Sequence, residues 1–228
     1  MLLLYRWSVL HPLPSVCLHW LEAAELARFA RLGSARLANS YAHAHLGLRC
    51  LLAQMRGEHP AALRFVLGRH GKPALSDGPH FSLSHAGGDA LLAISTQAPV
   101  GVDLEAVDPH LPMDWLPPLL SAQERAQQQS LGAAWSPWRF WVRKEAWLKA
   151  LGHGLAGDWG SSPVFCQPDL GSYRLAQEGG WVRDLSLPAP WIGALAWPVD
   201  RPLPPLRCQD LDLSLLIQNF IASENDYQ

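Results

Sequence analysis

The chain has 228 residues, of which 49% are hydrophobic, and a formal net charge of −2. This length allows one large domain or two small ones with an ample core, and the small net charge argues against a nucleic-acid-binding protein. The charge is uneven, however. Residues 1–72 contain nine Lys and Arg against three Asp and Glu, whereas the remainder contains nine against seventeen. A basic first third suits an anionic ligand or an acidic partner, although two ordinary solvated surfaces would give the same counts.

The cysteines and the amino terminus indicate the compartment. Four cysteines are widely spaced without a CxxC pair, which favours reduced thiols in a core. The apolar start MLLLYRW is too short for a signal peptide and lacks a basic region before it, and no apolar run reaches transmembrane length. We therefore expect a cytoplasmic protein without a membrane partner. The cysteines are Cys17, Cys50, Cys166 and Cys208.

The first half reads as a strand, two helices and a hairpin. Residues 2–9 favour a strand, and the apolar spacing of residues 18–32 and 36–55 predicts two helices. Residues 81–85 and 90–95 read as strands joined by a glycine turn.

Two segments of this half carry groups suited to phosphate. Lys72 lies between Gly71 and Pro73 in the expected loop 65–75 and could serve phosphate, although a lone loop lysine is often solvated. Ser84 and His85 end the strand at 81–85. Adjacent strand residues point to opposite faces and no G-x-S-x-G elbow is present, so a grip on phosphate oxygens suits this pair better than a hydrolase role.

The segment VGVDLEA (100–106) predicts a strand with paired acids. A period of two places Asp103 and Glu105 on one face, about 6–7 Å apart, while Val102 and Leu104 face the core. A bound cation would remove the repulsion between the carboxylates, and carboxylate-only donors favour Mg²⁺. Alone, the D-x-E pattern is weak, because edge strands often carry two solvated acids.

The second half repeats the order of the first faintly. After an expected linker at 107–118 and a helix at 119–131, residues 181–187 and 191–197 form a strand, a turn and an apolar strand. We read this as an internal duplication of helices followed by a hairpin. Residues 201–228 then form a proline-rich connection and a short helix at 212–221.

The segment SPWRFWVRKEAWLKALGHGL (136–155) predicts a helix between an N-cap Ser136 and a stop at Gly152 and Gly154. One of its stripes combines tryptophans with Glu145 and Lys149. A charged pair on an apolar stripe requires partners, so we expect either a partly buried salt bridge or a polar site in a Trp-rich wall.

Together these motifs resemble the 4′-phosphopantetheinyl transferases of the surfactin-synthetase-activating (Sfp-type) family. The specific combination is G-V-D-L-E followed by W-x-x-K-E-A-x-x-K-A-x-G-x-G-L, and the detailed match covers about residues 65–155. The resemblance implies an α+β fold of two similar α/β lobes in tandem, related by a pseudo-twofold with a ligand cleft between them. The corresponding boundaries are 1–106, 107–200 and a carboxyl-terminal extension at 201–228.

The resemblance also implies the reaction and the site. The enzyme would transfer 4′-phosphopantetheine from coenzyme A to a serine of an acyl, polyketide or peptidyl carrier protein, releasing 3′,5′-ADP. It would act as a monomer that is itself a pseudo-dimer. Asp103, Glu105 and Glu145 would hold Mg²⁺. Lys149 would contact the phosphates, and Lys72, Ser84 and His85 would bind those on the adenosine side.

Physical chemistry agrees with these roles. The attacking serine must lose a proton, and the charge on the phosphoryl oxygens must be neutralised. Glu145, directly or through a metal-bound water, is the best candidate base. First-half contacts to the 3′-phosphate are less defined, because the Arg-Phe that is common in relatives is replaced after Arg36. The candidates there are Arg31, Arg36, His43 and Arg49.

Two alternatives remain at this point. A non-catalytic coenzyme A or carrier-protein binding homologue would be expected to have lost one of the four central charged residues, all of which are present. A Mg²⁺-dependent phosphohydrolase would use the same three acids with water as the nucleophile.

Overall fold

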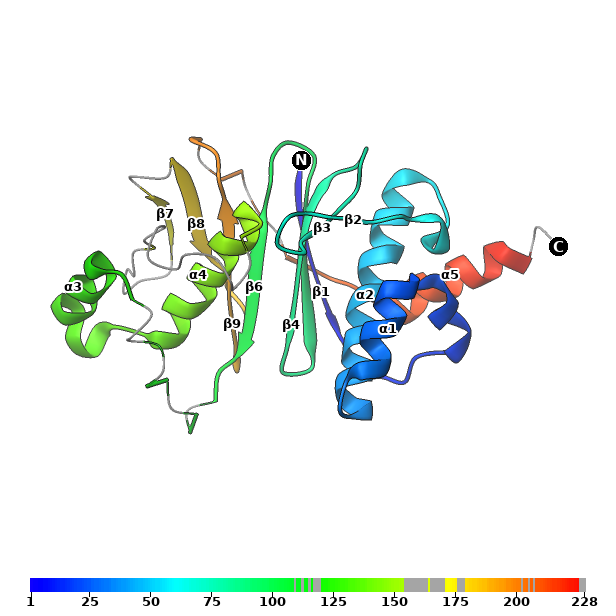
Figure 1. The fold of residues 1–228 in the computed structure, drawn as a ribbon, viewed down its shortest axis with the longest axis horizontal. Coiled ribbons are helices and arrows are strands. Elements are labelled where there is room, and N and C mark those ends of the chain that lie inside the picture. Colours follow the sequence, from blue (N-terminus) through cyan, green and yellow to red (C-terminus); the bar gives the residue numbers. More distant parts are fainter. Residues whose placement is uncertain are drawn as a thin grey trace.

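The computed structural model arranges the chain around two β-sheets that lie side by side, with helices on both outer sides (Figure 1). Gly154 and Leu155, which end the segment 136–155, and Cys166 lie outside the described residues. Those described are 1–108, 110–111, 113–114, 116, 120–153, 164, 171–175, 179–201, 203–204, 206 and 208–225.

The first sheet has the strand order β10-β1-β5-β4. Strands β1, β5 and β4 pair antiparallel and confirm the three strands expected in this half. The fourth strand, β10, pairs parallel with β1 and was not predicted. Their bounds are β1 Leu2–Ser8, β4 His80–Ala86, β5 Asp89–Ser95 and β10 Cys208–Asp210.

The second sheet has the order β6-β9-β8-β7, and all its pairs are antiparallel. Strands β6 and β4 lie next to each other in separate sheets (Figure 1), and the Val102 amide donates to Ser82 Oγ at 3.1 Å across this junction. The bounds are β6 Gly101–Ala106, β7 Ser172–Leu175, β8 Gly180–Asp184 and β9 Trp191–Trp197. The mixed α and β composition expected from the sequence is confirmed.

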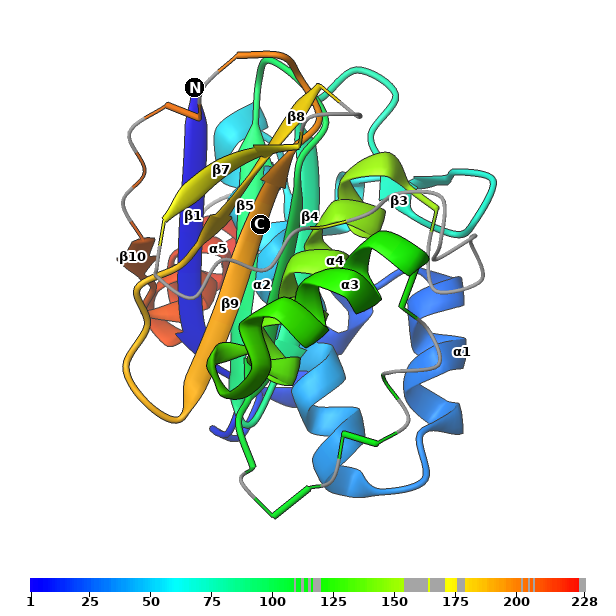
Figure 2. The same ribbon diagram turned by 90° about the vertical axis from the view of Figure 1, so that its left-hand side faces the viewer.

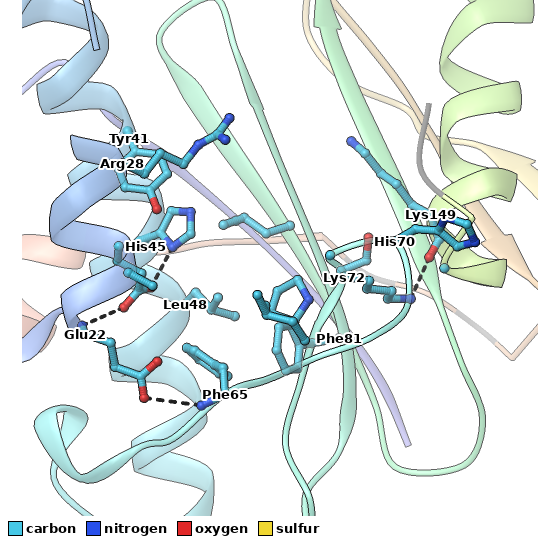
Figure 3. Close-up of a pocket in the computed structure, with 18 of the residues that line it drawn as sticks. Glu22, Arg28, Tyr41, His45, Leu48, Phe65, His70, Lys72, Phe81 and Lys149 are labelled. Atoms are coloured by element: carbon cyan, nitrogen blue, oxygen red, sulfur yellow. Dashed lines mark hydrogen bonds and ion pairs between the residues drawn. The ribbon is translucent and has the colours of Figure 1, made fainter. Parts of the chain in front are cut away.

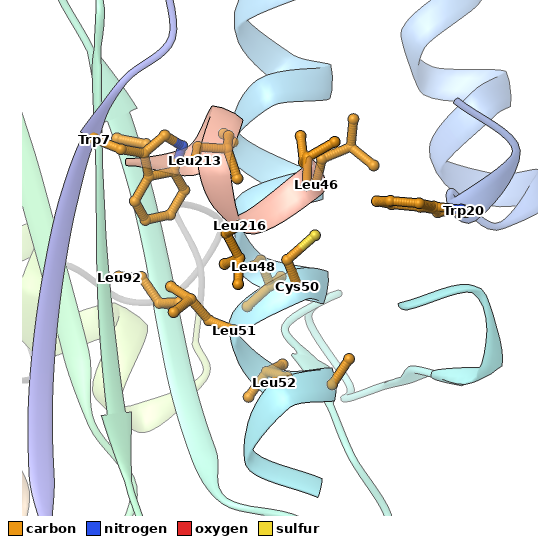
Figure 4. Close-up of a cluster of buried hydrophobic side chains, with 14 of the residues drawn as sticks. Trp7, Trp20, Leu46, Leu48, Cys50, Leu51, Leu52, Leu92, Leu213 and Leu216 are labelled. Carbon is orange, nitrogen blue, oxygen red and sulfur yellow. The ribbon is translucent and has the colours of Figure 1, made fainter. Parts of the chain in front are cut away.

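Helices α1, α2 and α5 lie beyond the first sheet. The helix predicted at 18–32 is wrong at its start: it is divided into a 3₁₀ turn and α1, because Glu22 and Glu25 form a capping box that begins a new helix. Leu48 and Leu51 of α2 pack against Leu92 of β5 and Leu216 of α5 (Figure 4). The bounds are η1 Ser15–Trp20, α1 Ala23–Arg31, α2 Ala35–Arg56, η2 Pro60–Ala62 and α5 Leu213–Asn225.

Helix α4, Pro137–Leu151, confirms the helix expected after Ser136. The Ser136 hydroxyl accepts from the Arg139 amide, and Gly152 ends the helix with a left-handed φ of 73°. The helix lies across β6 and β9 (Figure 2). A Cβ at Gly101 of β6 would stand only 1.9 Å from the Ala146 carbonyl oxygen, so this close approach requires glycine.

Two further helical elements, α3 Ala122–Leu131 and η4 Gly132–Ala134, precede α4. The expected loop at 65–75 contains a small hairpin of β2, Val66–Leu67, and β3, Pro73–Ala74. Among the helices that the structure describes, none combines the length and apolar character needed to cross a membrane.

Candidate active site

Strand β6 and helix α4 bring the predicted acidic residues to one place. Asp103 and Glu105 both face α4, as their spacing predicts: Asp103 contacts Lys149, and Glu105 accepts from Trp141 Nε1 at 3.0 Å. The intervening Val102 and Leu104 are buried in a hydrophobic core. Glu145 is also buried and interacts electrostatically with both acids.

Lys149 connects this cluster to the first sheet. Its ammonium donates to Asp103 Oδ1 at 2.5 Å and to Ser84 Oγ at 3.0 Å, and the Ser84 hydroxyl donates to the same Asp103 oxygen at 2.7 Å. Ser84 belongs to β4, Asp103 to β6 and Lys149 to α4. Three elements therefore meet at one partly buried hydrogen-bonded triangle.

Two carboxylates of the cluster, Glu145 and Glu105, have raised pKa values. Burial, followed by repulsion from Asp103 and Glu105, raises the pKa of Glu145 to about 7, although Lys149 opposes this shift. Burial and Asp103 also raise the pKa of Glu105, against the hydrogen bond from Trp141. This environment disfavours the ionised cluster unless a cation is added.

The donor chemistry of the cluster fits a hard divalent cation. Two buried oxygens, Asp103 Oδ2 and Glu145 Oε1, have no hydrogen-bond partner among the described residues, and buried carboxylate oxygens are the ligands that Mg²⁺ prefers. With the side chains as they stand, no group of three His, Cys, Asp or Glu in the described ranges could hold a metal ion. Two of the acids have other contacts in this arrangement: Asp103 accepts from Lys149, and Glu105 accepts from Trp141.

A cavity of about 600 Å³ opens beside Lys149 (Figure 3). Its walls come from both halves of the chain: α1, α2, the segment 65–73 and β4 form one side, and α4 with Gly152 forms the other. Phe65 and Phe81 supply aromatic surface, with ring centroids 5.5 Å apart. The cavity could therefore take a ligand that has both a flat apolar ring and charged groups.

Basic side chains from four elements converge on this cavity. Arg28, His45, His85 and Lys149 all line it. The pKa of His85 is lowered to about 4, first by loss of hydration in the concave site and then by the positive charges of His45, Lys149 and Arg28. Mutual repulsion of this kind is relieved by an anion, so the cavity is suited to phosphate.

A network at the base of the cavity was not predicted from the sequence. Glu25 binds His45 Nδ1 at 2.7 Å and Arg49 at 2.6 Å. Tyr41 stacks against the imidazole, with ring centroids 4.0 Å apart. The signal available in the sequence was the spacing of Tyr41, His45 and Arg49, which places all three on one stripe of α2.

The other first-half candidates lie elsewhere. Arg31 and Arg36 are exposed and do not line the cavity. His43 is buried and contacts the His11 carbonyl, and Arg49 is buried beneath the network. Lys72 lines the cavity, but its ammonium donates to backbone carbonyls. Arg28 and His45 are therefore better placed toward the cavity than the predicted arginines.

The fold and site define an α/β protein with a phosphate-suited cavity beside a buried carboxylate cluster. A family model described as the 4′-phosphopantetheinyl transferase superfamily matches residues 99–187, which include β6 and α4. A Synechocystis protein named provisionally as the 4′-phosphopantetheinyl transferase slr0495 is 31% identical over 169 residues, which cover 70% of this chain and 68% of that protein.

Two other relatives agree. The 4′-phosphopantetheinyl transferase HetI of Nostoc is 33% identical over 48% of this chain and 50% of its own. AcpT of Escherichia coli K12, which has the same enzyme name, is 34% identical over 38% of this chain and 48% of its own. The chain belongs to the 4′-phosphopantetheinyl transferase superfamily and is a transferase enzyme.

Proposed function

We propose that this enzyme transfers the 4′-phosphopantetheine group of coenzyme A to a serine of an acyl, polyketide or peptidyl carrier protein and releases 3′,5′-ADP. The names of its relatives support the transferred group. The basic first third of the chain suits both the phosphates of coenzyme A and an acidic carrier protein.

The position of Lys149 is the observation that carries this proposal. Its side chain lines the anion-suited cavity and also contacts Asp103 of the carboxylate cluster. A molecule with one phosphate in the cavity and others beside the carboxylate cluster would pair with the cations of the cavity and reach the acids of the cluster. Coenzyme A has this distribution of charge, since its 3′-phosphate and its pyrophosphate lie on opposite sides of the ribose.

The reaction forms a bond between the carrier serine oxygen and the phosphorus next to pantetheine, and it breaks the phosphoanhydride bond to the nucleotide. Glu145 accepts the serine proton, directly or through one water, because its buried carboxylate has a pKa near 7. Lys149 exchanges its Asp103 contact for phosphate oxygens and stabilises the charge that develops on the leaving group.

Asp103, Glu105 and Glu145 would hold Mg²⁺. The unpartnered oxygens of Asp103 and Glu145 support this assignment, and Glu105, which now accepts from Trp141, would supply the third carboxylate. When bound, the ion supplies Lewis-acid stabilisation of the phosphoryl oxygens. The protein's own contribution is to keep three acids together in a poorly hydrated position.

The co-substrate contacts follow the cavity. His85, Arg28 and His45 bind the 3′-phosphate, Ser84 and Lys149 face the pyrophosphate, and Lys72 contributes its side-chain stem to the wall. Arg31 and Arg36, expected earlier as ligands, would act through the surrounding field because they lie outside the cavity lining.

We also propose the finer classification. The enzyme is of the two-lobed, Sfp-type class, with lobes 1–106 and 107–200 related by a pseudo-twofold and an extension at 201–228. Two four-stranded sheets, each with an antiparallel hairpin, support this duplication. The proposed compartment is the cytoplasm. The enzyme acts as a monomer, since the two lobes of one chain already form the ligand cleft.

The decisive experiment incubates the protein with coenzyme A, Mg²⁺ and several apo carrier proteins, then weighs each carrier by mass spectrometry. We expect the mass of phosphopantetheine on at least one carrier. No gain on fatty-acid, polyketide and peptide carriers would reject the proposal. Phosphate release without any carrier would instead indicate the phosphohydrolase, and binding of coenzyme A without either product the non-catalytic homologue.

A further inference from the structure

The side chain of Lys72 crosses from the first half of the chain to the second. Lys72 belongs to the turn between β2 and β3, where its own carbonyl accepts from the Gly68 amide at 2.9 Å. Its ammonium donates to the carbonyl of Lys149 at 2.6 Å (Figure 3). It also donates to the carbonyl of Val100 at 3.0 Å and to that of Ala150 at 3.5 Å.

These three acceptors have a common position in the fold. Lys149 and Ala150 lie in the last turn of α4, where the carbonyls have no amide partner within the helix itself. The Lys149 carbonyl also accepts from the C-cap Gly152 amide at 3.2 Å, so Lys72 adds a second donor to it. A cation at this end also interacts favourably with the helix dipole. Val100 immediately precedes β6, the strand that carries Asp103 and Glu105. One ammonium therefore joins the end of α4 to the start of β6.

This arrangement leaves the Lys72 ammonium with few free N–H donors for a phosphate. An ammonium has three N–H donors, and three carbonyl oxygens stand within reach of them. A second contact between the same segments comes from His70 and His153, whose ring centroids lie 6.1 Å apart. Burial lowers the pKa of Lys72 to about 8, which agrees with a poorly hydrated group held by backbone oxygens.

We propose that Lys72 is a positioning residue, which caps α4 and fixes it against β6 so that Glu145 and Lys149 meet Asp103 in the reactive arrangement. This inference rests on the proposed function and replaces the expectation that the Lys72 ammonium binds a phosphate of coenzyme A. Its effect passes through the helix: Lys149 and Glu145 lie on neighbouring turns of α4, so rotation or fraying of the last turn moves both.

The test compares Lys72→Met with Arg69→Met. The methionine keeps the apolar stem of Lys72 and loses its donors, and Arg69 is an exposed cation of the same turn that does not line the cavity. In the transferase assay we expect Lys72→Met to lower kcat about tenfold or more, because small misplacement of reacting groups is costly. We expect KM for coenzyme A to change less than about threefold, and Arg69→Met to match the parent.

A higher KM for coenzyme A with unchanged kcat would indicate that Lys72 is a phosphate ligand and would overturn the proposal. Unchanged values for both parameters would overturn it as well. Lys72→Arg should recover most of the lost kcat, because the guanidinium can again donate to the carbonyls.

A second readout does not depend on catalysis. Hydrogen exchange followed by mass spectrometry should show faster exchange in the last turn of α4 in Lys72→Met, and unchanged exchange there in Arg69→Met. If circular dichroism shows that Lys72→Met is unfolded, Lys72→Gln takes its place, with changes in the same direction but of smaller size, because its neutral amide retains two N–H donors. If the parent itself transfers nothing, the proposed function fails, while equal exchange in parent and variant rejects the role of Lys72.

Discussion

Two regions of α4 bury charge in opposite ways. On one side, Arg143 and Lys144 are fully buried, yet each has a fixed partner: Arg143 forms a two-point pair with Asp184, and Lys144 contacts Glu124 at 2.9 Å. On the other side, Glu145 is also buried, and its Oε1 has no hydrogen-bond partner in the described part of the chain.

This contrast indicates how structural charges can be told apart from functional ones on a single helix. Burial and sequence proximity are the same for Arg143, Lys144 and Glu145, so neither property identifies a site. What identifies a functional site is whether the buried charge has a matched partner. In a closed pair each charge compensates the other, so the fold is destabilised when one partner is removed. An open carboxylate beside two other acids is costly until a cation or substrate enters. We call these the closed pairs (Arg143–Asp184 and Lys144–Glu124) and the open cluster (Asp103, Glu105 and Glu145).

The largest effect is expected in the open cluster. Glu145→Gln should lower the transfer rate about a hundredfold or more, because it removes the proposed base and a charge of the metal site. Its thermal stability should stay equal or rise, since the substitution removes an uncompensated buried charge. Mass spectrometry of the carrier and thermal melts give the two measurements.

Glu58→Gln provides the matched control for that variant. Glu58 pairs with Arg56 near the surface and does not line the cavity, so the rate of Glu58→Gln should equal that of the parent. Near-normal transfer by Glu145→Gln would contradict both roles assigned to this residue. A large loss of stability in Glu145→Gln would mean that the open cluster is structural.

The next effect is expected in a closed pair. Asp184→Asn leaves the Arg143 guanidinium buried beside a neutral amide and should lower the free energy of unfolding by about 3–5 kcal/mol. The folded fraction should keep most of its transfer rate, because neither residue lines the cavity. Urea unfolding and rates measured below the melting temperature test the two parts.

A double variant sharpens this result. Arg143→Met combined with Asp184→Asn removes both charges, and part of the lost stability should return. If Asp184→Asn instead abolished transfer without any loss of stability, the distinction between closed pairs and open cluster would be wrong.

The caps of α4 and the alternation in β6 were predictable because their causes are local. Ser136 and Pro137 begin the helix, Gly152 ends it, and a period of two places Asp103 and Glu105 on one face. Each signal lies within a few residues of the feature that it controls, so no tertiary information is required.

The closed pairs and the base of the cavity were not predictable in this way. Lys144 and Glu124 are 20 residues apart, and Arg143 and Asp184 are 41 apart. Only the packing of α3 and β8 around α4 brings them together, so a sequence stripe cannot show which charges have partners. The role of Lys72 has the same origin, because its acceptors are backbone carbonyls that carry no sequence signature.

The smallest effect concerns pH. The pKa of Glu145 is about 7 in the folded protein and 4.5 in its ordinary state, because burial and then the Asp103 charge disfavour its ionised form. Between these values the folded protein binds more protons than the unfolded chain, so stability should fall as pH rises from 4.5 to 7. Thermal melts in EDTA should show this slope in the parent and less of it in Glu145→Gln.

Magnesium should oppose that slope, because a divalent cation binds the ionised carboxylates and stabilises the folded state by mass action. The melting temperature gained on replacing EDTA with Mg²⁺ should therefore be a few degrees near pH 7, should shrink toward pH 4.5, and should be lost in Glu145→Gln. Asp184→Asn serves as the control, since it should lower stability but still gain the same rise in melting temperature on addition of Mg²⁺. A shift of equal size at both pH values, or one that survives in Glu145→Gln, would mean that the cation binds elsewhere. Glu145 would then keep only its proposed role as the base.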